Sequence, residues 1–367
     1  MRECVIPEIL PAKESLEAWP RRRAEILELF AQNVYGRTPE LSFDEVKHCV
    51  LESLPLEGGT QRETHCLYFQ KQGKTVSLRY TMYDTPQRGQ ERWPCAVMIE
   101  PFDKNIQIQQ SPRRRYEHLP YDLLLEHHLI PVFAHVDDLC PDEAPDFDAR
   151  GLLRLFPRQG ADAWGAVGIW AWAASRVIDC LTEDARVDAG HIAVAGCSRA
   201  GKTALWCAAQ DPRVALVISN VSGCTGAAMT RGKRGEQIAD ITSVFPHWFC
   251  RNYRDFAGQE DRLPVDQHML LALAAPRPLY VSSASEDDWA DPEKEFESCL
   301  RVSELYERMG KTGLAGAAFP PVNTPLARGD VAYHLRQGAH GCHLYDWQQF
   351  VPFICREFGI EKKEQQE

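Results

Sequence analysis

The spacing of apolar residues changes along the chain and predicts where helices and strands lie. Residues 16–35 carry apolar side chains at roughly helical spacing among charged ones, which predicts a surface helix that packs on the main body. Three β-rich segments follow, separated by Gly-rich or polar turns. They predict strands at 46–54, 63–69 and 76–83, which would form an antiparallel edge.

Further along, the pattern changes to short apolar runs that alternate with longer helical segments. The runs 95–101 and 129–136 are typical of buried parallel strands. The alternation predicts an α/β fold: a mainly parallel sheet with helices on both faces, in three layers. The segments that carry it are a helix at 163–181, a strand at 191–195, a helix at 203–209, strands at 216–221 and 279–283, a helix at 293–309, a strand at 331–336 and a helix at 346–358.

The spacing of these segments favours a single domain over residues 1–367. Residues 1–45 would form an N-terminal helical arm, and residues 360–367 a charged tail without fixed structure. Residues 226–266 show little regular pattern. A stretch of that length is unusual in a compact domain unless it builds a site or a lid.

The formal net charge of −11 argues against a nucleic-acid partner. Two basic runs, Arg21–Arg23 and Arg113–Arg115, are interpreted as solvated surface. No apolar run reaches the roughly 18 residues of a membrane helix. We therefore expect no membrane partner, and we predict a monomer.

Cysteine usage and the first residues bear on the compartment. None of the 13 cysteines lies in a C-x-x-C pair, so the sequence supports neither a zinc nor a thioredoxin site. The start, Met1–Cys4, has no apolar stretch of the secretory type. A reducing cytoplasm is expected. The alternative is a secreted protein whose signal segment is absent from this sequence.

The segment HIAVAGCSRAGKTALWCAA, residues 191–209, carries the candidate nucleophile. A β-run ends at Gly196, Ser198 follows, and helix resumes after Gly201. This is the strand–turn–helix context of a nucleophile elbow. Small neighbours are needed at the turn. Gly196 and Gly201 supply them in a G-x-S-x-x-G spacing, with Ala200 where the second glycine usually falls.

An elbow serine needs a base and an orienting carboxylate, in the chain order Ser, acid, His. The loop after the strand at 279–283 contains three acids: Glu286, Asp287 and Asp288. His340 lies in a Gly-rich loop after the last strand. Both loops follow strand carboxyl ends, where open α/β sheets build their sites. The set predicts the α/β-hydrolase fold, with the backbone N–H of Arg199 in the oxyanion hole.

Six motifs resemble the glucuronoyl esterases, carbohydrate esterase family 15. The resemblance is close over about half the chain, from Ala163 onward. The family cleaves esters between 4-O-methyl-glucuronate of xylan and alcohols of lignin. The matching motifs are GCSRAGK at 196–202, SGCTGAA at 222–228, FPHWF at 245–249, LPVDQHMLLALAAPRPL at 263–279, EDDWADP at 286–292 and GAHG at 338–341.

The resemblance implies roles for residues that match the family's motifs. Arg199 resembles an arginine that helps to bind the oxyanion, Lys202 a lysine that contacts sugar hydroxyls, and Trp289 a tryptophan that packs on the uronate. The family's polar sugar contact aligns with Glu236 or Gln237. The alternatives are that Lys202 is an exposed helix lysine and Trp289 a packing aromatic. The functional interpretation is preferred, because both residues flank the proposed site.

The chain departs from the fungal members at the triad acid. They carry it in a Q-E-S-G setting, where this chain has Asn220-Val221-Ser222-Gly223, and Val221 cannot orient a histidine. Many bacterial members resemble this chain in having acids after the later strand. Asp287 is therefore our choice, with Glu286 and Asp288 in reserve.

Two further assignments near the site stay open. His340 is preferred to the nearby His343, because it has the glycine-flanked position. Some family members have a disulfide near Cys197 and Cys342. Two buried thiols are an equal alternative here.

The predicted function is a serine ester hydrolase acting on esters of (4-O-methyl-)glucuronic acid, without a metal or an organic cofactor. The rivals are an acetyl-xylan or other carbohydrate esterase, a non-catalytic carbohydrate-binding relative, and a peptidase of the same fold. Polymeric wall material stays outside cells. A cytoplasmic protein would therefore act on small imported glucuronate esters.

Overall fold

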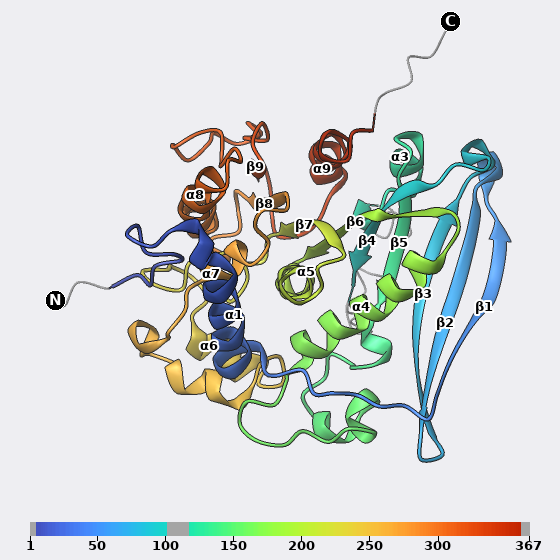
Figure 1. The fold of residues 1–367 in the computed structure, drawn as a ribbon, viewed down its shortest axis with the longest axis horizontal. Coiled ribbons are helices and arrows are strands. Elements are labelled where there is room, and N and C mark those ends of the chain that lie inside the picture. Colours follow the sequence, from blue (N-terminus) through green and yellow to red (C-terminus); the bar gives the residue numbers. More distant parts are fainter. Residues whose placement is uncertain (1–4, 101–116, 361–367) are drawn as a thin grey trace, which may run out of the picture.

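The strands of the chain form one mixed sheet, as seen in a computed structural model that describes residues 5–100 and 117–360. In these residues the sheet has nine strands, in the order β1-β2-β3-β5-β4-β6-β7-β8-β9 (Figure 1). The strands are β1 Glu45–Pro55, β2 Gln61–Lys71, β3 Lys74–Asp84, β4 Trp93–Ile99, β5 Ile130–His135, β6 Val187–Cys197, β7 Val214–Asn220, β8 Leu279–Ala284 and β9 Val331–Arg336.

The first strands pair differently from the rest of the sheet. The pairs β1–β2, β2–β3 and β3–β5 are antiparallel. From β5 through β4, β6, β7 and β8 to β9, every pair is parallel. The predicted mainly parallel sheet with an antiparallel N-terminal edge is confirmed.

Helices cover both faces of the sheet. They are α1 Trp19–Phe30, α3 Tyr121–Glu126, α4 Ala166–Glu183, α5 Arg199–Gln210, α6 Ile238–Val244, α7 Gln267–Ala272, α8 Pro292–Arg308 and α9 Leu344–Glu357. On one face lie α3 and α9, and on the other lie α4, α5 and α8, with α1 and α7 outside them (Figure 1).

Strand β6 shows why the sheet has two apolar faces. Side chains of successive strand residues point to opposite faces. Accordingly, Ala193 and Ala195 pack in the cluster with α3 and α9, whereas Ile192 and Val194 pack in the cluster with α4 and α5. Small side chains on one face and β-branched ones on the other hold this central strand between two helix layers.

The N-terminal segment differs in detail from the predicted helix. A 3₁₀ turn at Leu16–Ala18 leads into α1, and a π turn at Ala31–Tyr35 follows. Trp19, Ile26 and Phe30 are the buried residues of α1. The helix therefore packs on the main body as predicted, although its ends differ.

Several predicted boundaries were wrong by a few residues. Strand β6 begins at Val187 rather than 191, and α5 begins at Arg199 rather than 203. Helices α3, α6 and α7 were not predicted, because six or seven residues complete too few turns to show a period. The end of the predicted strand at Pro101, the basic run Arg113–Arg115 and the tail 361–367 lie outside the described residues.

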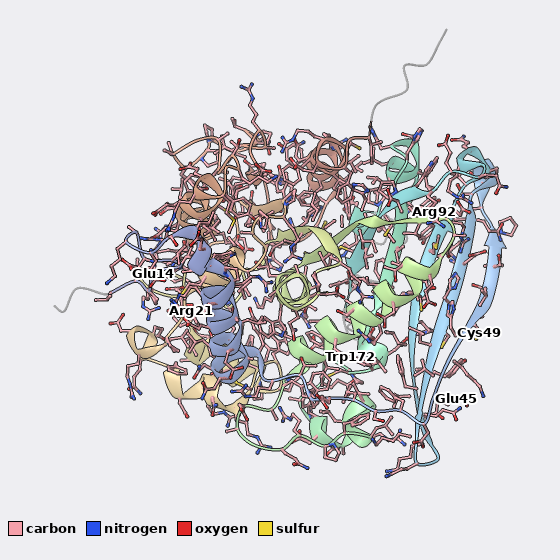
Figure 2. All side chains as sticks on the ribbon, in the orientation of Figure 1. Glu14, Arg21, Glu45, Cys49, Arg92 and Trp172 are labelled. Carbon is pink, nitrogen blue, oxygen red and sulfur yellow. The ribbon has the colours of Figure 1, made fainter. Side chains whose placement is uncertain are left out.

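Strand β1 is one of the two edges of the sheet, and β9 is the other. Figure 2 shows Glu45 and Cys49 on this strand at the periphery of the molecule. All its residues are exposed, and its register with β2 shifts between Val50 and Glu52. A bulge and charged side chains are devices that keep an open edge from pairing with other chains.

Among residues 5–100 and 117–360, no helix is long and apolar enough to cross a membrane.

Candidate active site

Ser198 sits in a sharp turn between β6 and α5. Its backbone has φ 58° and ψ −122°, a conformation that costs a non-glycine residue free energy and is typical of functional turns. The Ser198 N–H donates to the Asn220 carbonyl at the end of the neighbouring strand β7, 2.8 Å away. This bond ties the turn to the carboxyl edge of the sheet.

Neighbouring atoms leave no room for a side chain at the glycines around Ser198. A Cβ at Gly196 would lie 2.0 Å from the Ala200 carbonyl oxygen, and one at Gly201 would lie 2.9 Å from Ser222 Cβ. Ala200 is buried without such a conflict. The unusual G-x-S-x-x-G spacing therefore still meets the steric demand of an elbow.

His340 and Asp287 meet at the carboxyl ends of β9 and β8, which are neighbours in the sheet. His340 Nδ1 lies 2.6 Å from Asp287 Oδ2. An ionised carboxylate only accepts hydrogen bonds, so Nδ1–H donates and Nε2 is left as the basic nitrogen. This is the arrangement that a histidine base requires.

The other two acids of the loop point elsewhere. Asp287 is buried, with 6% of its side chain exposed, whereas Glu286 and Asp288 are exposed. Glu286 Oε1 accepts a hydrogen bond from Gln337 Nε2 at 3.0 Å. Of the three, Asp287 is the acid against His340.

His343 has a different place from His340. It is the N-cap residue of α9, in a reciprocal capping box with Asp346, and its Nδ1 lies 3.3 Å from Glu117. Val221, at the position of the fungal acid, is buried with φ 41° and has no group that could orient a histidine.

Arg199 extends from the first position of α5 toward a buried carboxylate. Its Nη1 forms an ion pair with Asp142 Oδ2, and its guanidinium carbon lies 5.0 Å from the Trp248 ring centroid and 5.7 Å from that of Phe245. Asp142 lies in the loop after β5, and sequence analysis missed it. Nothing in the local pattern points to it, because its partners are more than fifty residues away.

Lys202 is buried, contrary to the alternative of an exposed helix lysine. Its Nζ donates to the Ser222 carbonyl, and burial lowers the pKa of its amine. The carboxylate of Glu236 acts against that shift, so the two charges are close enough to interact.

Glu236 and Gln237 differ in whether their polar side-chain atoms are already engaged in local hydrogen bonds. The Gln237 amide donates to the carbonyls of Lys233 at 2.9 Å and Gly235 at 3.1 Å, and its oxygen caps α6. Its polar atoms are therefore used locally. Glu236 N–H donates to the Trp289 carbonyl at 3.0 Å, which places Glu236 beside Trp289. The Trp289 residue is 56% exposed.

Glu295 of α8 is a second residue that sequence analysis missed. It is buried and accepts hydrogen bonds from Gly223 N–H at 2.8 Å and Ser283 Oγ at 2.6 Å. Because Lys202 holds the Ser222 carbonyl, the Ser222–Gly223 peptide is held from both ends. Burial raises the pKa of Glu295 to about 7.

Cys197 and Cys342 are free thiols in the structure. Burial raises the pKa of both, so neither thiol is poised as a thiolate nucleophile. Within the described residues, no group of three or more His, Cys, Asp or Glu side chains is arranged to hold a metal ion.

Comparison with known proteins gives consistent results. The model of the family "Glucuronyl esterase, fungi" matches residues 151–310. Carbohydrate esterase MZ0003, from an unknown prokaryotic organism, is 41% identical over 223 residues, which is 58% of this chain and 51% of that protein. A 4-O-methyl-glucuronoyl methylesterase of Wolfiporia cocos is 34% identical over 184 residues, 47% of this chain and 45% of that one.

The solved structures extend the likeness over the whole chain. A glucuronoyl esterase from Solibacter usitatus superimposes with a TM-score of 0.86 at 30% identity, covering 97% of this chain and 98% of that one. The sequence matches to the curated relatives are shorter, since the chain spans about half the length of each. Fold, elbow and full-length likeness agree, and the chain belongs to the glucuronoyl esterases of carbohydrate esterase family 15.

Proposed function

We propose that the protein is a serine carboxylic-ester hydrolase that cleaves esters of glucuronic or 4-O-methyl-glucuronic acid. The observation that carries the proposal is the 2.6 Å contact of His340 Nδ1 with Asp287, in the loops that follow two adjacent parallel strands. The elbow serine at the end of β6 supplies the nucleophile. The substrate class comes from the family and from the names of its members.

The proposed reaction has two steps. His340 takes the Ser198 proton as Oγ attacks the ester carbonyl, and Asp287 stabilises the imidazolium that forms. Arg199 and backbone N–H groups bind the oxyanion. The intermediate collapses, and the alcohol leaves with the proton from His340. Water then attacks the acyl-enzyme with His340 as base, which releases glucuronate and restores Ser198.

We further propose that Glu236 and Trp289 bind the sugar. Trp289 offers an exposed ring that a pyranose can cover. The backbone of Glu236 is bonded to that of Trp289, so the two residues are neighbours, and Glu236 adds a carboxylate. Gln237 is left out of this set because its amide caps α6. Lys202 stays a proposed sugar contact, because its bond to the Ser222 carbonyl uses one of three ammonium donors. Its charge also interacts with that of Glu236.

The test is hydrolysis of benzyl glucuronate beside p-nitrophenyl acetate, for wild type, Ser198→Ala and a matched Ser53→Ala control. Ser53 lies on β1, at the far edge of the sheet from β6. We expect uronate-ester turnover in wild type and control that is lost in Ser198→Ala. Acetate turnover alone would contradict the glucuronoyl assignment. No turnover of either ester would favour a binding protein, and cleavage of chromogenic amides a peptidase.

A cytoplasmic monomer with one domain remains part of the proposal. Its substrates there would be small imported glucuronate esters. Protein found in the culture medium, or a dimer in size-exclusion chromatography, would contradict those parts alone.

A further inference from the structure

We propose that Asp142 is a positioning residue that holds the Arg199 guanidinium in place for the oxyanion, and that it acts on the reaction only through Arg199. The inference rests on the proposed function of Arg199. It adds a residue from the loop after β5, far in sequence from the nucleophile, the base and the acid.

The Asp142 carboxylate accepts hydrogen bonds from three donors in two other segments. Arg199 pairs with Oδ2, while Trp248 Nε1 and His247 Nε2 lie 2.6 Å and 2.9 Å from Oδ1. The Asp142 side chain is only 3% exposed. A carboxylate so buried requires both hydrogen bonds and a compensating charge.

Only one of the three donors carries that charge. Burial and the neighbouring Arg199 charge lower the pKa of His247 to about 4, so its ring is neutral at physiological pH. Trp248 is neutral as well. The two rings therefore fix the carboxylate, and the carboxylate in turn has Arg199 as its cationic partner.

An arginine needs such a partner to act at one defined point. Its side chain has many rotamers, and ordering it costs free energy during each turnover unless the fold has already done so. Asp142 fixes one end of the guanidinium, and the faces of Phe245 and Trp248 lie beside it. Residues 245–248 and the loop after β5 therefore position the Arg199 side chain, which contacts within α5 alone would not fix.

The test is a double-mutant cycle on kcat with Asp142→Asn and Arg199→Met. Arg199→Met should lower kcat about 100-fold, as the loss of an oxyanion donor does. Asp142→Asn keeps an acceptor for the two rings but removes the charge, and should lower kcat about tenfold or more with little change in KM. In the Arg199→Met background, Asp142→Asn should have no further effect.

Asp148→Asn is the matched control. Asp148 lies six residues further along the chain, is half-exposed, and pairs with Arg158 and Arg251. We expect wild-type kcat from it. An equal loss from Asp142→Asn in both backgrounds would overturn the proposal, since it would show a role independent of Arg199.

Two further arms keep the test decisive. Should Asp142→Asn fail to fold, Trp248→Phe removes one donor to Asp142, and the same cycle applies. A loss of kcat seen with Arg199 present but absent in Arg199→Met supports the proposal. An equal loss in both overturns it. If wild type turns over p-nitrophenyl acetate but not benzyl glucuronate, the proposed substrate class fails. The cycle is then measured on the acetate, so the two failures are distinguishable.

Discussion

At the scale of single residues, the loop after β8 shows how surroundings divide three similar acids. Glu286, Asp287 and Asp288 have nearly equal chemistry and adjacent positions. Only Asp287 is both buried and 2.6 Å from His340. Burial keeps the Asp287 carboxylate in one place against the His340 Nδ1, which is what orienting the ring requires.

We expect Asp287→Asn to lower kcat by about 100-fold to 10,000-fold, because the amide can hold the histidine in the wrong tautomer. Steady-state hydrolysis of benzyl glucuronate measures the effect. The controls Glu286→Gln and Asp288→Asn should stay within about threefold of wild type, since exposed charges interact weakly with the site. A loss as large in either control would assign the orienting acid to that residue instead.

Glu295 leads to a prediction about stability and pH. Its pKa is raised from 4.5 to about 7 by burial, so between these values the folded chain keeps a proton that the unfolded chain has lost. The free energy of unfolding therefore falls as pH rises through this window, by about 3 kcal/mol for this group.

Glu295→Gln removes that titration. From pH 4.5 to pH 8, the free energy of unfolding of the variant should rise relative to wild type by about 3 kcal/mol, measured by urea unfolding at both pH values. A difference between the two proteins that is the same at both pH values would show that Glu295 titrates normally.

At the scale of elements, the junction of β6 and α5 depends on how closely two backbone segments approach. The helix begins one residue after Ser198, and its Ala200 carbonyl passes where a Cβ at Gly196 would be. A strand cannot turn into a helix in so few residues unless one side chain is absent.

Gly196→Ala should therefore destabilise the fold by about 3 kcal/mol or more and abolish turnover. Thermal unfolding and ester hydrolysis measure the two effects. Gly190→Ala on the same strand is the matched control, because its nearest neighbour would be a side-chain oxygen 3.5 Å away, an ordinary contact. Equal melting temperatures of the two variants would contradict the steric argument.

At the scale of the whole molecule, the N-terminal segment is fastened to helices far away in sequence. Arg308 of α8 donates to the carbonyls of Leu10 at 3.0 Å and Glu14 at 2.7 Å. His268 Nε2 lies 2.8 Å from the Pro7 carbonyl. Glu14 also pairs with Arg21 of α1, 3.4 Å apart, and both are labelled in Figure 2.

Arg308→Ala should release this segment, because two hydrogen bonds from a charged donor are lost, worth about 1.5–3 kcal/mol each. We expect limited proteolysis with thermolysin, followed by mass spectrometry, to find cleavage within residues 5–18 earlier than in wild type. Arg301→Ala is the control on the same helix, because the Arg301 guanidinium donates to neighbouring Glu297 and makes no hydrogen bond to residues 5–18, all of which the structure describes. Equal cleavage rates would show that the other contacts suffice.

Comparing sequence with structure, the elements that carry a strong local signal were predicted well. β-rich segments between turns identified the first three strands, and short apolar runs identified the other six. Glycine spacing predicted the elbow, because it depends on backbone space near one residue. Short helices such as α7 were not predicted, because six residues are too few to show a helical repeat of apolar positions.

The sequence by itself predicted the fold class, Ser198 as nucleophile, His340 as base and Asp287 as the preferred acid of three, together with the family resemblance. Only the tertiary structure showed that Asp287, and neither Glu286 nor Asp288, lies against His340. It also showed that the Gln237 amide is bonded locally, that Asp142 pairs with Arg199, and that Glu295 holds the Gly223 N–H. The reason is physical. Hydrogen bonds and ion pairs act over a few ångströms in space, and between distant segments only folding brings those atoms together.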